Sequence, residues 1–194
     1  MIFQERTYAV LIVSASEKLD TQMRALLPAT DYYPVQSARS VGQARRMLLE
    51  EPFDLVLIQT PLKDDFGVQL AIDVCADSSA GALLFVRAEL FDSVSAKVME
   101  YGVVTLSMPT SSALVTQSLR MLCAQRERIR RMEAKQQSVE EKIAEIRLVN
   151  HAKWLLIECL SMTESDAQHY IEKQSMDQRI TKRQAAEAVI RTYG

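Results

Sequence analysis

Short runs of apolar residues that recur along the first half of the chain constrain its fold more than any other feature. Val10–Val13 and Leu55–Ile58 are apolar at every position, which is typical of strands buried on both faces of a parallel sheet. We therefore expect a doubly wound α/β domain with a parallel sheet over residues 1–110. Its five strands are predicted at Tyr8–Val13, Tyr33–Ser37, Asp54–Ile58, Ala82–Val86 and Val103–Ser107, separated by amphipathic segments of helical length.

Composition narrows the class of protein. The chain has 194 residues, a formal charge of −2 and no apolar run long enough for a membrane span. We expect a cytoplasmic protein without a membrane partner, in which any nucleic-acid binding comes from a local patch. The three cysteines include no close pair, so we predict no disulfide framework, metal site or cofactor.

The residues that follow each predicted strand indicate what the first domain can do, because the functional crevice of such sheets lies at the carboxyl ends of the strands. The segment Phe53–Gly67 and the order of elements resemble the response-regulator receiver family. The resemblance implies a receiver-like, flavodoxin-like fold for residues 1–110. In that family the third strand ends in a phosphate-accepting aspartate, with a glycine eight residues later. Gly67 fits the glycine, and Gln59 occupies the place of the aspartate.

The other family positions have changed as well. Five residues form the predicted degenerate phosphorylation site: Ser14 and Ala15 where receivers carry a magnesium-binding acidic pair, Gln59, Arg87 at the switch hydroxyl, and Met108 at the conserved lysine. Phosphoryl transfer to a carboxylate needs a nucleophilic oxygen, a divalent cation and a lysine. All three are missing at these positions, so we predict a pseudo-receiver with no catalytic residue.

Three charged residues near this crevice leave alternatives open. Asp64 and Asp65 follow the third strand, and we interpret them as a solvated turn, with a relocated metal site as the alternative. Arg87 could bind an anion near Gln59 or lie in solvent as a structural side chain.

A long helix is predicted after the receiver-like domain, because no Gly or Pro occurs between Thr110 and Gly194. Apolar residues recur there at alternating intervals of three and four, which is a heptad pattern. We predict a coiled-coil dimerisation helix over residues 111–146. The dimer interface is predicted at Leu122, Ile129, Met132, Val139, Ile143 and Ile146. The alternative is an ordinary last receiver helix that is followed by a flexible linker.

Residues 147–194 read as a small three-helix bundle. Arg147–Leu160 has one apolar face, and capping-box patterns begin at Thr163 and at Thr181. Short amphipathic helices can bury a common core only by packing together.

The same segment is similar to the ANTAR domain, the RNA-binding module of bacterial transcription antiterminators. The resemblance lies at Arg147, Ala152-Lys153, Leu156, Glu164, Ala167, Ile171, Ser175-Met176, Ala186 and Ile190, with Ser175 in place of the usual Ala. A receiver-like domain and a coiled coil in front of it are the usual architecture of that family. The resemblance implies a dimer that binds paired hairpins in nascent messenger RNA and so prevents a terminator from forming.

RNA binding requires a focused basic surface, since basic and acidic residues are nearly balanced after Arg147. The predicted RNA-binding residues are Lys153, Lys173, Arg179, Lys182 and Arg183. Backbone donors at a helix start could add to the charges of Lys182 and Arg183. Trp154 suits either base stacking or the dimer seam.

Two functions from different classes follow. The first is an RNA-binding antiterminator that is not an enzyme and is controlled, without phosphorylation, by a regulatory protein or small ligand at the receiver-like domain. The second is a protein–protein adaptor with weak or no RNA binding, which the near-neutral charge of the last segment favours. Salt-dependent RNA binding would separate the two.

Overall fold

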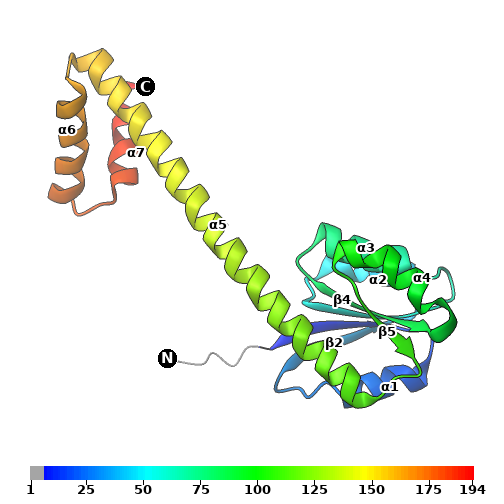
Figure 1. Cartoon of the computed structure of the whole chain (residues 1–194). Coiled ribbons are helices and arrows are strands. Elements are labelled where there is room, and N and C mark those ends of the chain that lie inside the picture. Colours follow the sequence, from blue (N-terminus) through cyan, green and yellow to red (C-terminus); the bar gives the residue numbers. More distant parts are fainter. Residues whose placement is uncertain (1–6) are drawn as a thin grey trace. The chain divides into compact units, whose positions relative to one another are not determined.

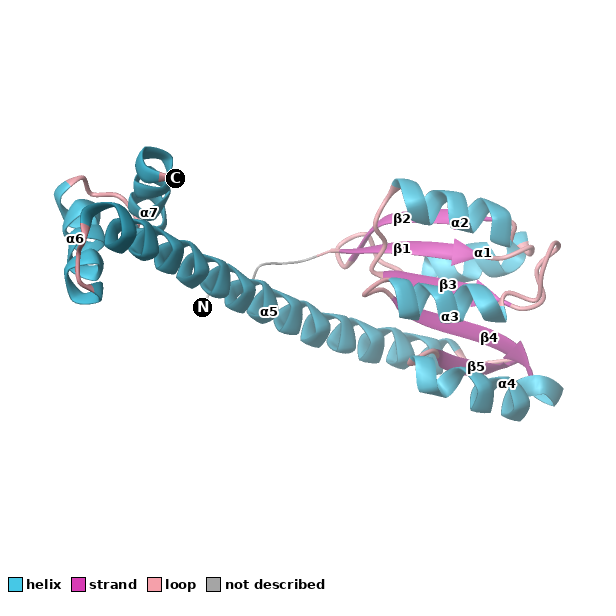
Figure 2. Ribbon diagram, turned by 90° about the horizontal axis from the view of Figure 1, so that it is seen from above, coloured by secondary structure: helices cyan, strands magenta, loops and turns pink. Residues whose placement is uncertain are grey.

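The computed structural model describes residues 7–194, which form two compact units that divide between Arg131 and Met132. The first unit contains a five-stranded parallel sheet with the order β2-β1-β3-β4-β5 (Figure 2). The strands are β1 (Tyr8–Val13), β2 (Tyr32–Ala38), β3 (Leu55–Gln59), β4 (Gly81–Arg87) and β5 (Val104–Met108). Each agrees with its predicted range to within about one residue at either end, so the predicted doubly wound sheet is confirmed.

Helices cover both faces of this sheet. They are α1 (Glu17–Ala25), α2 (Val41–Glu50), α3 (Val68–Asp77), α4 (Phe91–Val98) and the start of α5 (Ser112–Leu160), with 3-10 turns at Ala88–Leu90 and Met99–Tyr101. Figure 1 shows α2, α3 and α4 on one face and α1 and α5 on the other. Each face has its own apolar cluster, because neighbouring residues of a strand point to opposite sides.

Local signals set where two of these helices begin. Ser40 caps α2 as predicted, since its side chain accepts a hydrogen bond from the backbone N–H of Gln43. Gly67 precedes α3 with a φ of 86°, and a Cβ there would lie 3.1 Å from a side-chain carbon of Ile58. Gly67 is therefore required both by the left-handed backbone and by the close approach of β3.

The first turns of α5 belong to the core of the first unit. Val115, Leu119 and Leu122 are each 1% exposed and pack in the same apolar cluster as Leu55 of β3. The sequence placed Leu122 on a dimer seam, and this assignment has to be corrected. The Leu122 side chain packs against the sheet of its own unit and is not exposed to a partner. Ile129 is also half-buried within the first unit.

A buried carboxylate fixes the next turns of α5 to the edge of the sheet. Asp54, just before β3, accepts a hydrogen bond from the backbone N–H of Ala9 at 3.0 Å. Its Oδ1 also pairs with Nε of Arg126 at 3.4 Å and with a guanidinium nitrogen of Arg130. The Arg130 guanidinium lies 5.8 Å from the centre of the Tyr8 ring. Sequence reasoning missed this cluster because Asp54 lies more than 70 residues from both arginines.

The second unit, residues 132–194, contains the rest of α5, α6 (Glu164–Asp177) and α7 (Lys182–Tyr193). Its core is a cluster of small and aliphatic residues from all three helices: Ala152, Leu156, Ala167, Ile171, Ala185, Ala186 and Val189. Thr181 forms the predicted capping box with Gln184. Thr163 caps α6, and its hydroxyl donates a hydrogen bond to the Asp166 carboxylate. That carboxylate does not accept a hydrogen bond from the backbone N–H of Thr163, as a capping box would require.

The coil and the first helix of the bundle are one uninterrupted helix, and the separate piece predicted at Arg147–Leu160 is its last part. Nothing in the sequence between residues 140 and 150 breaks a helix, since that stretch has no Gly, Pro or capping pattern. No helix among residues 7–194 combines the length and the apolar character that crossing a bilayer would require.

Candidate functional site

The carboxyl edge of the sheet holds the residues of the predicted degenerate phosphorylation site. Register places Val13 beside Ile58, so Ser14 and Gln59 follow on neighbouring strands. Ser14 is 2% exposed, and its hydroxyl donates a hydrogen bond of 2.6 Å to Oε1 of Gln59. The structure therefore joins two positions that carry magnesium ligands and the phosphate acceptor in receivers, and it joins them by a neutral hydrogen bond.

The remaining members of this site also lie at strand ends. Arg87 and Met108 are register partners at the ends of β4 and β5, and Ala15 follows Ser14 at the end of β1. Arg87 is exposed and has no ion pair within residues 7–194. The predicted anion contact of Arg87 stays a prediction.

The acidic residues that follow β3 near the crevice accept hydrogen bonds from backbone N–H groups. Asp64 accepts hydrogen bonds from the backbone N–H groups of Val41 at 2.9 Å and Gly42 at 3.0 Å, so it caps the start of α2. The Gly42 bond is the largest of the causes that hold the pKa of Asp64 below its usual value. Asp65 accepts from the backbone N–H of Gly67 at 2.7 Å. These loop carboxylates satisfy backbone donors, which the interpretation as a solvated turn did not foresee.

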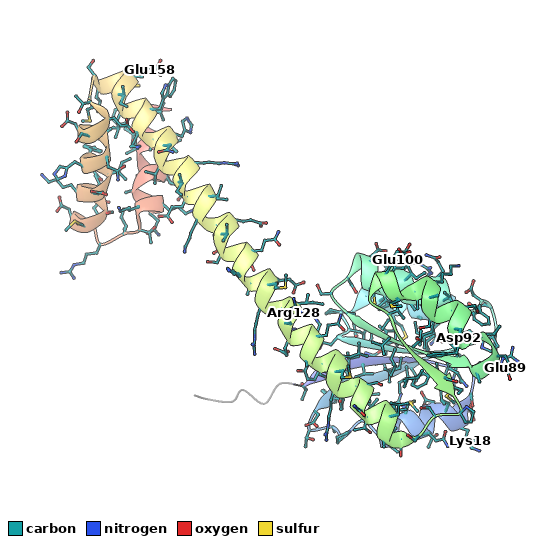
Figure 3. The ribbon with its side chains drawn as sticks, viewed as in Figure 1. Lys18, Glu89, Asp92, Glu100, Arg128 and Glu158 are labelled. Carbon is teal, nitrogen blue, oxygen red and sulfur yellow. The ribbon has the colours of Figure 1, made fainter. Side chains whose placement is uncertain are left out.

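The side chains of Glu89 and Asp92, which follow β4, project outward (Figure 3). Within residues 7–194, no three His, Cys, Asp or Glu side chains are grouped as a metal ion would need. The crevice offers hydroxyl and amide groups, which bind by hydrogen bonding and do not form an acyl phosphate.

The second unit presents the five predicted RNA-binding cations in two different states. Three of them are paired with glutamates of the same unit: Lys153 with Glu164 at 3.2 Å, Lys182 with Glu172 at 2.8 Å, and Arg183 with Glu187 at 3.0 Å. Lys173 and Arg179 are exposed and have no ion pair within the described chain.

The pairing changes what each cation can offer to a ligand. The Lys153 side chain is only 15% exposed, so it is the least available of the five. The hydrogen bond from Lys182 is the largest cause that lowers the pKa of Glu172. Arg179 lies in the link between α6 and α7 with a φ of 53°, a strained conformation for a residue other than glycine.

An exposed apolar stripe runs along α5 within the second unit. It consists of Met132, Val139, Ile143, Ile146, Ile157 and Leu160. Met132 and Ile146 are each 60% exposed, although they are large apolar side chains. Helical geometry places most of this stripe opposite Ala152, Leu155 and Leu156, which face the bundle core. Four of the six residues predicted for the dimer interface therefore lie on one uncovered face.

Trp154 lies beside this stripe and is 56% exposed. Its ring centre is 6.5 Å from that of His151, one turn earlier on the helix. The tryptophan is thus not a core residue of its own bundle, and both interpretations made from the sequence remain predictions.

The geometry of the first unit, with a five-stranded parallel sheet whose crevice lies at the carboxyl edge, is that of a receiver domain. Two solved structures share this fold. The signal receiver domain of an HD domain-containing protein from Pseudomonas fluorescens Pf-5 has a TM-score of 0.58 and 21% identity, covering 68% of this chain and 96% of that one. A CheY-like receiver domain from Methanospirillum hungatei JF-1 has a TM-score of 0.54 and 18% identity, covering 63% and 99%.

The second unit matches a family model. Residues 137–190 match the ANTAR domain. The chain is also 23% identical over 185 residues to the transcriptional regulatory protein PdtaR of Mycobacterium tuberculosis, covering 95% of this chain and 90% of the relative. Together, the ANTAR match of the second unit, the similarity to PdtaR and the receiver-like fold of the first unit support an ANTAR-type response regulator, a class of transcription regulator in the antiterminator family. The families that it matches are regulators.

Proposed function

We propose that the chain is an RNA-binding transcription antiterminator that acts as a homodimer on hairpins in nascent messenger RNA, under control that does not use aspartyl phosphorylation. The observation that carries this proposal is the ANTAR match over residues 137–190, which covers most of the second unit. In functional terms we assign residues 1–110 to the pseudo-receiver, 111–146 to the dimerisation helix and 147–194 to RNA binding.

Control without phosphorylation follows from the crevice. The position of the acceptor holds Gln59, whose amide oxygen accepts from Ser14 and is a poor nucleophile. A labelled small phosphodonor such as acetyl phosphate should leave no label on the chain, whereas a typical receiver in the same assay takes it up. Gln59→Asp alone should not restore labelling, because Ser14 and Ala15 still provide no carboxylate for magnesium. Stable incorporation by the native chain would refute this part of the proposal.

Dimerisation would cover the apolar stripe of α5. Its spacing of three and four residues from Met132 to Leu160 is that of a coiled-coil seam, and Gln136 and Asn150 interrupt it with amides that help to fix register. A second copy of the same stripe matches it in length and chemistry. Ile143→Asp should therefore produce a folded monomer in sedimentation equilibrium, and Lys142→Asp, which changes an exposed neighbour, should leave the dimer intact.

RNA would bind through the cations of the second unit. Lys173 and Arg179 are available at once, and Lys182 and Arg183 would exchange their glutamates for phosphates. Each phosphate contact releases counterions, so binding should weaken as salt rises. Lys182 begins α7, where backbone N–H groups add partial positive charge.

The adaptor remains a second candidate, because Lys153, Lys182 and Arg183 are all engaged by glutamates within their own unit. In that function the α5 stripe and the receiver-like domain would contact proteins, and the cations would only stabilise the bundle. Such a protein would not distinguish hairpin RNA from a polyanion of similar charge.

The deciding experiment is a titration of the protein into labelled RNA with two short hairpins, at low and physiological salt. We expect salt-dependent binding that weakens at least tenfold in Lys182→Ala/Arg183→Ala. The control variant Lys63→Ala/Lys97→Ala removes two exposed cations of the first unit and should bind as the native chain does. Failure of the folded, dimeric protein to bind at either salt would favour the adaptor.

A further inference from the structure

The outward face of α6 carries a row of exposed side chains that phosphate contacts alone do not explain. His169, Lys173 and Met176 follow one another at intervals of four and three residues, so they lie on one side of the helix. The buried residues Ala167 and Ile171 face the opposite way, into the bundle that α6 forms with α5 and α7 (Figure 1). The row is therefore not used for packing within its own unit.

Arg179 lies directly beyond this row, in the link between α6 and α7. Its backbone N–H donates a hydrogen bond to the carbonyl of Met176 at 3.2 Å, which holds the link against the last turn of α6. Lys173 and Arg179 are the two exposed cations of the unit that have no ion pair within the described chain but were predicted to bind RNA. We call His169, Lys173, Met176 and Arg179 the α6 ridge.

Met176 sets the ridge apart from a simple basic patch. Its side chain is 77% exposed, and a single exposed methionine is ordinary on a protein surface. This one, however, lies within one turn of Lys173 and Arg179 and about 10 Å along the helix axis from the His169 imidazole. Phosphates need only charge, so neither the thioether nor the imidazole has a use in a pure phosphate site. A ligand with both phosphates and flat apolar groups would use every member of the ridge.

RNA with unpaired bases is a ligand of this kind. The bases of a hairpin loop leave the helical stack, and proteins hold them by stacking them on imidazole and other flat side chains while cations contact the neighbouring phosphates. A thioether also makes favourable contacts with aromatic rings. A protein partner would instead need a continuous apolar patch, and Lys173 separates His169 from Met176 on this face. The ridge therefore fits an RNA loop better than a protein surface.

We propose that the α6 ridge recognises unpaired bases of an RNA loop, with His169 and Met176 against the faces of bases and with Lys173 and Arg179 on the flanking phosphates. This inference rests on the proposed function and adds two residues to it. Contacts with phosphates carry no direct information about the bases. His169 and Met176 would therefore supply the preference for a loop over a duplex or a bare phosphate chain.

The test compares the binding of the full chain to three labelled RNAs: the two-hairpin RNA, the same RNA with abasic nucleotides in both loops, and a fully paired duplex of equal length. At one salt concentration, we expect the native chain to bind the first RNA at least about tenfold more tightly than the other two. His169→Ala/Met176→Ala should reduce this preference to about threefold or less and should bind the abasic RNA as the native chain does. Because both side chains are exposed, the Tm of the variant should stay within about 2 °C of the native value.

Salt dependence separates the two kinds of contact in the ridge. Lys173→Ala/Arg179→Ala should reduce the slope of log affinity against log salt by about 1.4, because each phosphate contact with a single strand contributes about 0.7. His169→Ala/Met176→Ala should leave the slope unchanged. His169→Phe/Met176→Leu keeps a flat ring and an apolar chain, so it should retain the loop preference. The matched control is Met99→Ala, at a methionine of the first unit that is 68% exposed, and it should behave as the native chain does.

The outcomes distinguish this inference from the proposed function. If the native chain binds RNA but does not prefer the intact loops, or if His169→Ala/Met176→Ala keeps the full preference, the assignment of the ridge is wrong and the proposed function stands. If the folded native chain binds none of the three RNAs, both are refuted, and a protein becomes the candidate partner of the ridge.

Discussion

Truncation of Leu122 to alanine tests whether this heptad residue stabilises the first unit or a dimer. Leu122 is 1% exposed in a cluster with Leu55 and Leu119. One of its methyl carbons lies 3.0 Å from where a Cβ of Gly81 would be, so the leucine fits directly onto the glycine backbone. Leu122→Ala would leave a cavity there that Gly81 cannot fill.

The expected loss follows from this burial. Fully buried leucines cost about 3 to 5 kcal/mol when truncated, through lost transfer free energy and the cavity that remains. We expect about 3 kcal/mol for Leu122→Ala, since part of α5 can relax at this edge of the unit. For a domain of this size, that loss corresponds to a Tm lower by about 10 °C.

The assay is thermal and urea unfolding at two protein concentrations about a hundredfold apart, with sedimentation equilibrium on the same samples. Leu122→Ala should lower the transition of the first unit equally at both concentrations and leave dimer affinity unchanged. Ile143→Ala, a truncation on the exposed stripe, should leave the transition of the first unit unchanged and weaken the dimer. If Leu122→Ala weakens the dimer and leaves the first transition in place, the assignment of Leu122 to the core is wrong.

Further substitutions test three individual contacts. Asp64→Ala should destabilise the chain at neutral pH. The pKa of Asp64 is lowered in the folded chain. The stability that its carboxylate contributes is therefore complete above the unfolded pKa and is lost as pH falls through the folded pKa. Urea unfolding of the native chain and the variant as a function of pH would show this difference. Asp54→Ala should cost about 3 kcal/mol in urea unfolding, since the Arg130 guanidinium loses its buried partner; an unchanged midpoint would contradict this. Thr181→Ala should cost about 1 kcal/mol by loss of the cap on α7, measured as a lower Tm of the second unit, and Gln184→Ala should cost less.

Local patterns were sufficient to predict most of the fold. Five apolar runs gave the five strands, and Ser40 and Thr181 marked helix starts because a side-chain oxygen can cap a free N–H in any tertiary context. The placement of residues at the carboxyl edge of the sheet was also predictable, since the end of each strand fixes which residues meet there. The hydrogen bond between Ser14 and Gln59 agrees with that placement.

Contacts between distant segments were not predictable in this way. The heptad pattern could not distinguish Leu122, which packs on its own sheet, from Ile143, because both continue the same spacing. The glutamates that pair with Lys153 and Lys182 could not be predicted either, since each lies on another helix, 10 or 11 residues away in the sequence.

The sequence by itself thus determined which segments are strands and helices, that the acceptor aspartate is absent, and that α5 carries a periodic apolar face. These properties depend on residue type and on the periods of the helix and the strand, so residues that are close in the sequence suffice to define them. Only the tertiary structure decided which part of that face is already covered, which cations are neutralised, and that Asp54 holds Arg126 and Arg130. Burial and ion pairing depend on distances between segments far apart in the chain, and no local period specifies those distances.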